Sequence, residues 1–203
     1  WPARIAEVAM WLMDHLMNRD LSEKLGQYFA RLPLAKSARI LQANALRTDW
    51  KELLPPSQCS YVMGNPPFVG QTYRTDEQNQ DVRDVFGDVR LVNSIDYVAC
   101  WYVKAADYMR GHKDKSIRCA FVSTNSITQG EQVEPIWRTL IERGIVIHFA
   151  HRTFKWESEA RGKAHVHVVI IGFGLLDHSP KLIFDYSDDG DPIVYTAKNI
   201  NPY

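Results

Sequence analysis

Two consecutive prolines, Pro66 and Pro67, constrain the fold more than any other feature of the sequence, because they stand just behind a short apolar run at residues 61–63. Proline has no backbone N–H for a β-ladder and fixes its own φ, so a strand over residues 61–63 must end before the prolines. We predict that this strand is buried. Ligands of open α/β sheets bind beyond the carboxyl ends of strands, where the turn at residues 65–68 places an amide, two rigid residues and an aromatic ring. Such a turn is suited to gripping a planar amine.

The rest of the chain alternates between two hydrophobic patterns. Apolar residues at helical spacing predict helices over residues 2–17, 76–86, 95–109 and 133–141. Apolar runs predict strands over residues 38–42, 61–63, 117–123, 145–149, 165–171 and 181–184. Because strands alternate with helices, we predict an α/β fold with a doubly wound, mostly parallel sheet. The two long late strands have no helical pattern between them, so we expect them to form an antiparallel pair.

The composition limits the classes of protein to which the chain can belong. Lys+Arg and Asp+Glu both number 24, so no overall basic field indicates nucleic acid, and any such contact must be local. The three cysteines are far apart, which indicates reduced intracellular thiols and gives no zinc spacing. No apolar run reaches membrane length and no signal segment opens the chain. We therefore predict a cytoplasmic protein without a membrane partner.

One segment, residues 151–163, departs from this balance because it is both basic and aromatic. It joins the two late strands, and an antiparallel pair would bring it to the same end of the sheet as Asn65. Cationic side chains can contact phosphates while aromatic rings stack on bases. We predict DNA contact by Arg152, Phe154, Lys155, Trp156, Arg161 and Lys163. The alternative is a solvated hairpin loop whose Glu157 and Glu159 balance its charge.

The turn Asn65-Pro66-Pro67-Phe68 resembles the fourth motif of the amino-methyltransferases that use S-adenosylmethionine, and Phe in the last place suggests adenine N6. Residues 65–70, 123–132 and 148–154 together resemble the MmeI-like (type IIL/IIG) restriction-modification family. In that family, methyltransferase, target-recognition and nuclease parts share one chain. The resemblance covers most of the sequence and implies a Rossmann-like methyltransferase core that acts on a flipped adenine in double-stranded DNA.

The chemistry of an adenine amine explains the predicted catalytic residues Asn65, Pro66, Pro67 and Phe68. Adenine N6 is a poor nucleophile because its lone pair is shared with the ring. Two acceptors on its hydrogens, the Asn65 side-chain oxygen and the Pro66 carbonyl, would aim the freed lone pair at a methyl sulfonium. Stacking on Phe68 is worth about 1–3 kcal/mol, which offsets much of the cost of flipping the base. No metal is required for this transfer.

The resemblance also assigns cofactor contacts. It implies that Asp49 accepts a hydrogen bond from the adenine amine of S-adenosylmethionine, that Trp50 lies against the purine, and that Asn65 borders the cofactor. The alternative is that Asp49 caps the turn at residues 50–53 and Trp50 packs in the core. Residues 123–126 either line the pocket or end a strand and cap the next helix.

The glycine-rich loop and the acidic residue that hold the cofactor in this family stand upstream of a region like residues 1–17, and neither is in the sequence. We therefore expect a single partial methyltransferase domain over residues 1–203, incomplete at its N-terminus. Its expected parts are the region after the cofactor motif (1–58), the catalytic half (59–175) and the start of a link to a following domain (176–203). Such a piece is expected to bind the cofactor weakly or not at all and to be inactive alone. Alternatives are a nucleic-acid-binding or scaffolding module, or a methyltransferase acting on RNA or a protein glutamine.

Overall fold

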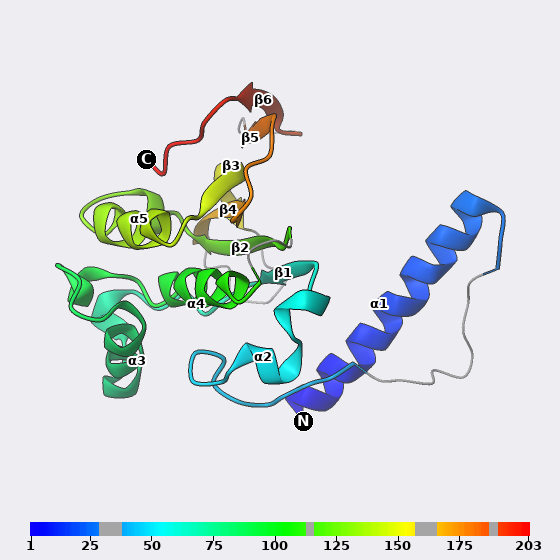
Figure 1. The fold of residues 1–203 in the computed structure, drawn as a ribbon, viewed down its shortest axis with the longest axis horizontal. Helices are drawn as coiled ribbons and strands as arrows, with labels where there is room; N and C mark the ends of the chain where they lie inside the picture. Colours follow the sequence, from blue (N-terminus) through cyan, green and yellow to red (C-terminus); the bar gives the residue numbers. More distant parts are fainter. Residues whose placement is uncertain (29–37, 113–115, 157–165, 187–190) are drawn as a thin grey trace. The chain divides into compact units, whose positions relative to one another are not determined.

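The computed structural model describes residues 1–28, 38–112, 116–156, 166–186 and 191–203 (Figure 1). The chain divides into two compact units, Trp1–Thr48 and Asp49–Tyr203. Among the described residues, no helix is both long enough and apolar enough to cross a membrane.

The first unit consists mainly of helix α1 (Pro2–Leu25), which continues eight residues beyond the predicted end at residue 17. It starts with Pro2, whose fixed φ suits a first helical turn, and ends at Gly26 in the left-handed conformation with φ 64°. The strand predicted over residues 38–42 is wrong, because this segment has no regular secondary structure. Its apolar residues Ile40 and Leu41 stay exposed, so burial does not hold the segment as a strand.

The second unit contains one mixed sheet. In the described residues it has six strands in the order β1-β2-β4-β3-β5-β6. Their bounds are β1 (Tyr61–Gly64), β2 (Arg118–Thr124), β3 (Val146–Trp156), β4 (Val166–Gly174), β5 (Lys181–Asp185) and β6 (Ile193–Ala197). The pairs β1–β2 and β3–β5 are parallel, and the other three pairs are antiparallel. The predicted α/β fold and its antiparallel late pair, β3–β4, are confirmed. Strand β6 was not predicted.

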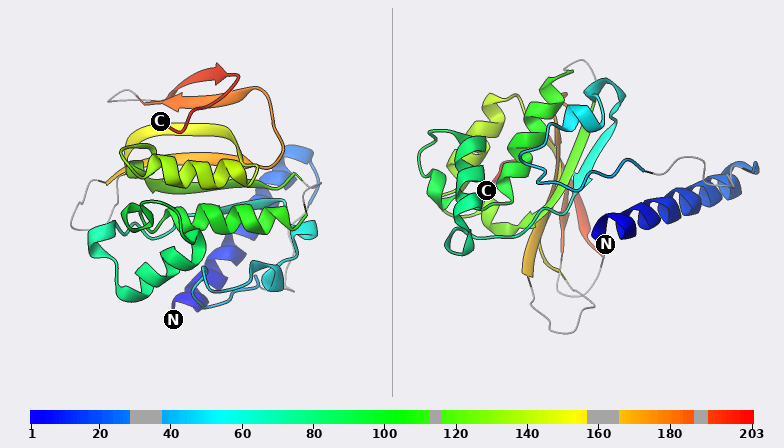
Figure 2. Two further views of the ribbon diagram at one scale, coloured as in Figure 1. Left: turned by 60° about the vertical axis from the view of Figure 1, so that its left-hand side comes forward. Right: turned by 90° about the horizontal axis from the view of Figure 1, so that it is seen from below.

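Helices α3, α4 and α5 lie on one face of this sheet (Figure 2). The helices of the second unit are α2 (Trp50–Leu53), α3 (Asp76–Phe86), α4 (Ala99–Arg110) and α5 (Val133–Glu142). Fully buried Tyr102 of α4 joins the layers, because its ring stacks on Phe173 of β4 with 5.2 Å between centroids and meets Phe121 of β2 edge-on at 5.3 Å. The core of the unit therefore lies between the helices and strands β2 and β4.

Strand β1 ends as predicted, at Gly64, just before Asn65. Its predicted burial is wrong, since Tyr61 is 69% exposed and Met63 is 82% exposed. The reason is its place in the sheet. It is the first strand in the order, and among the described strands it pairs only with β2.

Candidate active site

The candidate active site lies at the edge of the sheet where β1 and β2 both end. The two strands are parallel, with Gly64 opposite Phe121, so the residues that follow them emerge at the same edge. Asn65 follows β1 directly, and Asn125 follows β2. The predicted catalytic turn therefore stands beside the polar end of a neighbouring strand.

The turn itself is partly anchored and partly open. Pro66 is buried and Phe68 is half-buried, whereas Asn65 and Pro67 are exposed. The chain after the turn is fixed by a backbone hydrogen bond of 3.1 Å, in which the Tyr97 N–H donates to the Val69 carbonyl. The amide of Asn65 is thus presented to solvent by a backbone that follows β1 and is fixed beyond the turn at Val69.

The segment that is hydrogen-bonded to the chain after this turn, residues 93–97, forms several further hydrogen bonds. We call it the junction segment. The Arg74 guanidinium donates hydrogen bonds of 2.6 and 2.9 Å to two of its backbone carbonyls. The Tyr97 hydroxyl donates to the carboxylate of Asp81 on α3 at 2.7 Å, and Asp81 is only 3% exposed. The junction segment therefore links α3, the start of α4 and the candidate turn.

A polar cluster, which we call the Asp96 cluster, joins the junction segment to the end of β2. Its members are Asp96, Thr124, Ser126 and Gln132. The Ser126 hydroxyl donates to the Asp96 carboxylate, and the Ser126 and Thr124 hydroxyl oxygens are 2.8 Å apart. Gln132 donates to the same carboxylate oxygen at 3.3 Å and accepts from the Asp96 N–H at 2.8 Å. No local pattern indicates this role for Asp96 or Gln132, because the partners are 30 and 36 residues apart.

The two interpretations of residues 123–126 divide between neighbouring side chains. Ser123 is fully buried, and its hydroxyl lies 2.8 Å from that of Tyr102, where burial raises the Tyr102 pKa. Thr124 and Ser126 are half-buried and belong to the Asp96 cluster at the sheet edge. The first hydroxyl therefore serves the core, and the other two face the candidate site region.

The structure holds Asp49 and Trp50 at a different place from the turn. The Asp49 carboxylate caps α2 by accepting from the Lys51 N–H at 3.0 Å. The Trp50 ring packs against Tyr108, with 5.8 Å between centroids, near the end of α4. The candidate turn is tied to Tyr97, just before α4 begins at Ala99, and Tyr108 lies nine residues further along the helix, or roughly 14 Å. The capping and packing alternatives describe these contacts, and the cofactor role of the two residues stays a prediction.

The predicted DNA-binding residues that the structure describes lie at the far end of β3. Phe154 of β3 and Thr124 of β2 both pair with Val168 of β4, so both strands run to the same edge. With strands about 4.8 Å apart, Phe154 and the turn after β1 are separated sideways by roughly 15 Å. The described residues of the set are Arg152, Phe154, Lys155 and Trp156, whereas Arg161 and Lys163 lie outside the described residues.

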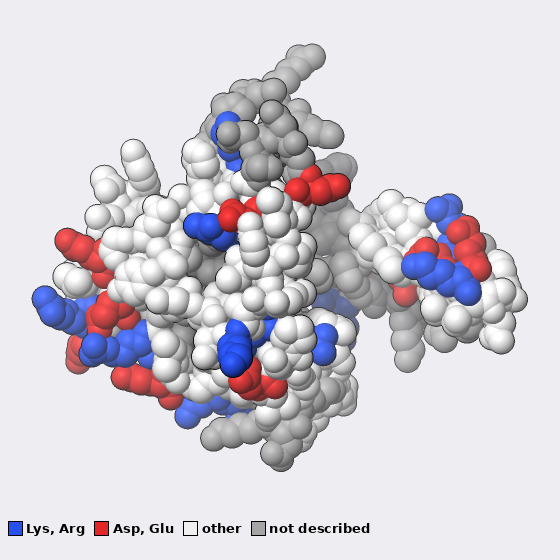
Figure 3. Space-filling model, turned by 90° about the horizontal axis from the view of Figure 1, so that it is seen from above, with Lys and Arg blue, Asp and Glu red and all other residues white. Residues whose placement is uncertain are grey.

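Charge and aromatic character are distributed unevenly along this end of β3. Arg152 forms a 2.7 Å ion pair with Asp185 of β5, so its charge is partly neutralised. Lys155 and Trp156 are exposed, whereas Phe154 is half-buried against Tyr186 with 4.7 Å between centroids. On the face that Figure 3 shows, basic and acidic side chains of the described residues are interspersed. Contact with a polyanion would therefore rest on a few local side chains.

Behind Phe154 lies an aromatic cluster that the sequence did not reveal. The His151 ring stacks on Phe184 with 4.2 Å between centroids, and its Nδ1 is 2.6 Å from the Tyr186 hydroxyl. Burial lowers the pKa of His151 and raises that of Tyr186. Phe184 and Tyr186 belong to the β5 region, so their place beside β3 follows from strand pairing rather than from a local motif.

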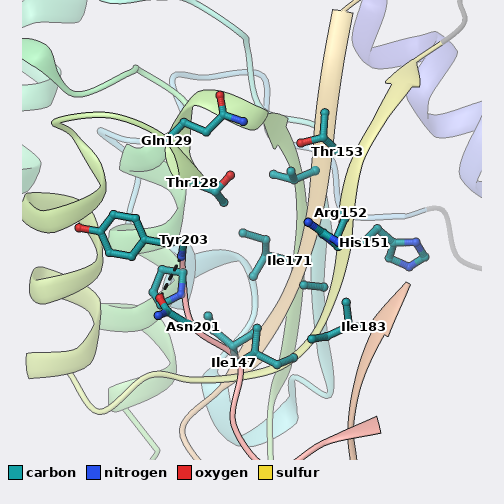
Figure 4. Close-up of a pocket in the computed structure, with 14 residues that line it drawn as sticks. Thr128, Gln129, Ile147, His151, Arg152, Thr153, Ile171, Ile183, Asn201 and Tyr203 are labelled. Carbon is teal, nitrogen blue, oxygen red and sulfur yellow. Dashed lines mark hydrogen bonds between the residues drawn. The ribbon is translucent and has the colours of Figure 1, made fainter. Parts of the chain in front are cut away.

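A cavity of about 270 Å³ lies near β3 but away from the candidate turn (Figure 4). Its lining includes the apolar residues Ile171 and Ile183 and the polar residues Gln129, Arg152 and Asn201. Figure 4 shows the His151 ring turned away from its interior. The sequence did not predict this cavity. Within the described residues, no group of three His, Cys, Asp or Glu side chains is arranged to hold a metal ion.

Comparison with known proteins gives consistent matches over nearly the whole chain. The family described as the DNA-methyltransferase domain of MmeI matches residues 1–185. A curated protein of Bacillus subtilis (strain 168), DNA methyltransferase A, is 37% identical over 202 residues, which is 98% of this chain and 22% of that protein. The solved structure of the type IIL restriction-modification enzyme MmeI in complex with DNA is 53% identical, with a TM-score of 0.88 over 99% of this chain and 27% of that one. The chain thus spans about a quarter or less of the length of these relatives.

Proposed function

Because the chain belongs to the family of MmeI DNA-methyltransferase domains, we propose that the polypeptide containing it methylates adenine N6 in double-stranded DNA. The proposed methyl donor is S-adenosylmethionine, and the proposed setting is a restriction-modification protein. Target-recognition and nuclease parts of the same polypeptide are its proposed partners. The observation that carries the proposal is the exposed Asn65 amide, held at a strand end by buried Pro66.

The proposed chemical role of the turn is to make the adenine amine nucleophilic. The Asn65 side-chain oxygen and the Pro66 carbonyl each accept one of the two N6 hydrogens, which frees the nitrogen lone pair. Pro66 and Pro67 restrict the backbone, so the two acceptors need little reorganisation when the base arrives. Phe68 is half-buried, so part of its ring surface is open to the flipped base.

S-adenosylmethionine, when bound, supplies a methyl group on a positively charged sulfur. Exposed Asn65 fits a position beside that group because it offers an uncharged acceptor. Asp49 and Trp50 are the proposed contacts of the cofactor adenine. Capping uses one acceptor site of the Asp49 carboxylate, and a carboxylate has about four, so an exocyclic amine can still be accommodated.

Proposed DNA contact comes from the end of β3. Lys155 is exposed for a phosphate contact, and Trp156 and Phe154 offer rings beyond the same sheet edge as Asn65. The proposed contribution of Arg152 is smaller, since Asp185 already pairs with it. Arg161 and Lys163 complete the proposed set.

A second candidate function is a nucleic-acid-binding or scaffolding module without catalysis. The placement of Asp49 and Trp50 near the end of α4 opposite the candidate turn favours this alternative. Methylation of RNA or of a protein glutamine is a further possibility for a turn of this type. One assay separates the alternatives, because transfer would label RNA or protein in two of them and a module without catalysis would transfer no label.

The assay uses the complete polypeptide that contains this chain, labelled S-adenosylmethionine and duplex DNA, followed by digestion to nucleosides. We expect label in N6-methyladenine, and we expect Asn65→Ala to lower the rate by at least about 100-fold, since each preorganised contact of this kind is worth that much. Asn79→Ala on α3 is the matched control and should leave the rate unchanged. Label only in RNA or protein would overturn the substrate, and DNA binding without transfer would favour the scaffolding module.

A further inference from the structure

The candidate turn follows a strand that is held by few contacts. Strand β1 has four residues, is largely exposed, and among the described strands pairs only with β2. Its own ladder therefore gives Asn65 little rigidity. The additional constraint comes from the junction segment, where the Tyr97 N–H holds the Val69 carbonyl at 3.1 Å. Whatever fixes the junction segment also fixes the turn.

One side chain fixes the junction segment to the end of β2. The Asp96 carboxylate accepts from the Ser126 hydroxyl and from Gln132, while the Asp96 N–H donates to the Gln132 side-chain oxygen at 2.8 Å. Its other carboxylate oxygen faces Gly70, where an added Cβ would lie 3.7 Å away. Asp96 thus stands between the loop that follows β1 and the loop that follows β2.

We infer that Asp96 is a positioning residue that holds the loop after β1 against the loop after β2 and so aims Asn65 at the target amine. The inference rests on the proposed methyl transfer. Asp96 contacts neither substrate nor cofactor in this role, and its effect passes through Val69 and Ser126. Because a shift of about 1 Å in a reacting geometry can slow a reaction by about 100-fold, loss of this tie should affect turnover more than binding.

The test compares Asp96→Ala with Asp96→Asn in the complete polypeptide. Asparagine keeps an acceptor oxygen for Ser126 and Gln132, whereas alanine removes it. We expect Asp96→Ala to lower kcat by about 10–100-fold with the Kd for DNA changed less than about 3-fold, and Asp96→Asn to retain kcat within about 5-fold. Asp107→Ala is the matched control, since this aspartate lies on α4 and its ion pair with Arg143 is at the helix surface. It should leave kcat unchanged.

Two further readouts separate positioning from folding and from the proposed function. Once the methylated position has been mapped, 2-aminopurine placed there reports by fluorescence whether the base still leaves the helix, and circular dichroism reports the folded fraction. A normal fluorescence change with low kcat supports the inference. Wild-type kcat in Asp96→Ala, equal loss in both Asp96 variants, or a loss that tracks the unfolded fraction would overturn it. Absence of transfer by the wild-type polypeptide would instead defeat the proposed function.

Discussion

A tyrosine lies near each end of helix α4, and the two tyrosines have different hydrogen-bond partners. The difference separates the candidate site from the packing that supports it. Before the first turn, the Tyr97 hydroxyl donates to the buried carboxylate of Asp81, and the Arg74 guanidinium donates to the Ile95 carbonyl of the junction segment. In the last turn, the Tyr108 hydroxyl donates to the Leu54 carbonyl at 2.6 Å and its ring meets Trp50. One end gathers ionisable side chains around the turn of Asn65, and the other end uses a backbone carbonyl and aromatic packing. Polar groups that converge on a strand end are typical of binding sites, whereas the second arrangement serves stability.

The largest expected effects come from replacing one aromatic ring near each end of α4, Phe68 at the candidate turn and Trp50 beside Tyr108. We expect Phe68→Ala in the complete polypeptide to lower kcat/KM for duplex DNA by about 5–150-fold, because stacking on a flipped base is worth about 1–3 kcal/mol. We expect Trp50→Ala to lower the free energy of unfolding by about 1–3 kcal/mol through lost packing against Tyr108. We also expect it to raise KM for S-adenosylmethionine, since Trp50 is a proposed contact of the cofactor adenine. Steady-state kinetics and thermal melts measure both. A lowered melting temperature with an unchanged KM for S-adenosylmethionine would instead assign Trp50 to packing alone.

The two tyrosine hydroxyls give a smaller but more direct test. Tyr97→Phe removes one donor from a buried carboxylate, so we expect a loss of about 1–3 kcal/mol in the free energy of unfolding. Tyr108→Phe removes a donor from a backbone carbonyl near the surface, and we expect about 0.5–1.5 kcal/mol. Denaturant titration monitored by circular dichroism measures both variants. Equal losses would show that the two ends of α4 do not differ in the way that their hydrogen bonds indicate.

The parts of the fold that depend on local chemistry could be predicted from the sequence. The end of β1 at Gly64 follows from the two prolines, which act on the backbone beside them. Helix α3 matches its predicted bounds, since it has acidic residues in the first turn and an apolar face. Thr75 caps its N-terminus with a capping box. The antiparallel pairing of β3 and β4 was predicted because the sequence between them has no helical period.

The parts that depend on distant partners could not be predicted. The exposure of Met63 follows from the place of β1 in the strand order, which no local pattern carries. Strand β3 continues seven residues beyond its predicted end, because pairing with β4, with two irregularities in register, holds it extended. The Asp96 cluster joins residues 30 and 36 positions apart, so a single aspartate at the start of the helix predicted over residues 95–109 gave no signal.

The smallest expected effect concerns the aromatic cluster at the end of β3, which lies at the same sheet edge as the turn but is held by stacked rings. Burial lowers the pKa of His151, so the folded protein favours the neutral ring. The resulting stability is present above the unfolded pKa of about 6.5 and is lost as the pH falls through the lower folded pKa. His151→Phe keeps a ring against Phe184 but cannot titrate.

We therefore expect the melting temperature of the wild-type polypeptide to fall further between pH 7 and pH 5 than that of His151→Phe, by at most a few degrees. His148, whose pKa burial also lowers, contributes to both proteins and cancels in the comparison. His167→Gln, at an exposed position of β4, is the matched control and should respond to pH like the wild type. Parallel pH responses of wild type and His151→Phe would mean that the stacked histidine is protonated as easily in the folded cluster as in the unfolded chain. In that case the end of β3 would carry an additional positive charge below pH 7. It would then resemble the Asp96 cluster in being charged, and the contrast between the two regions would disappear.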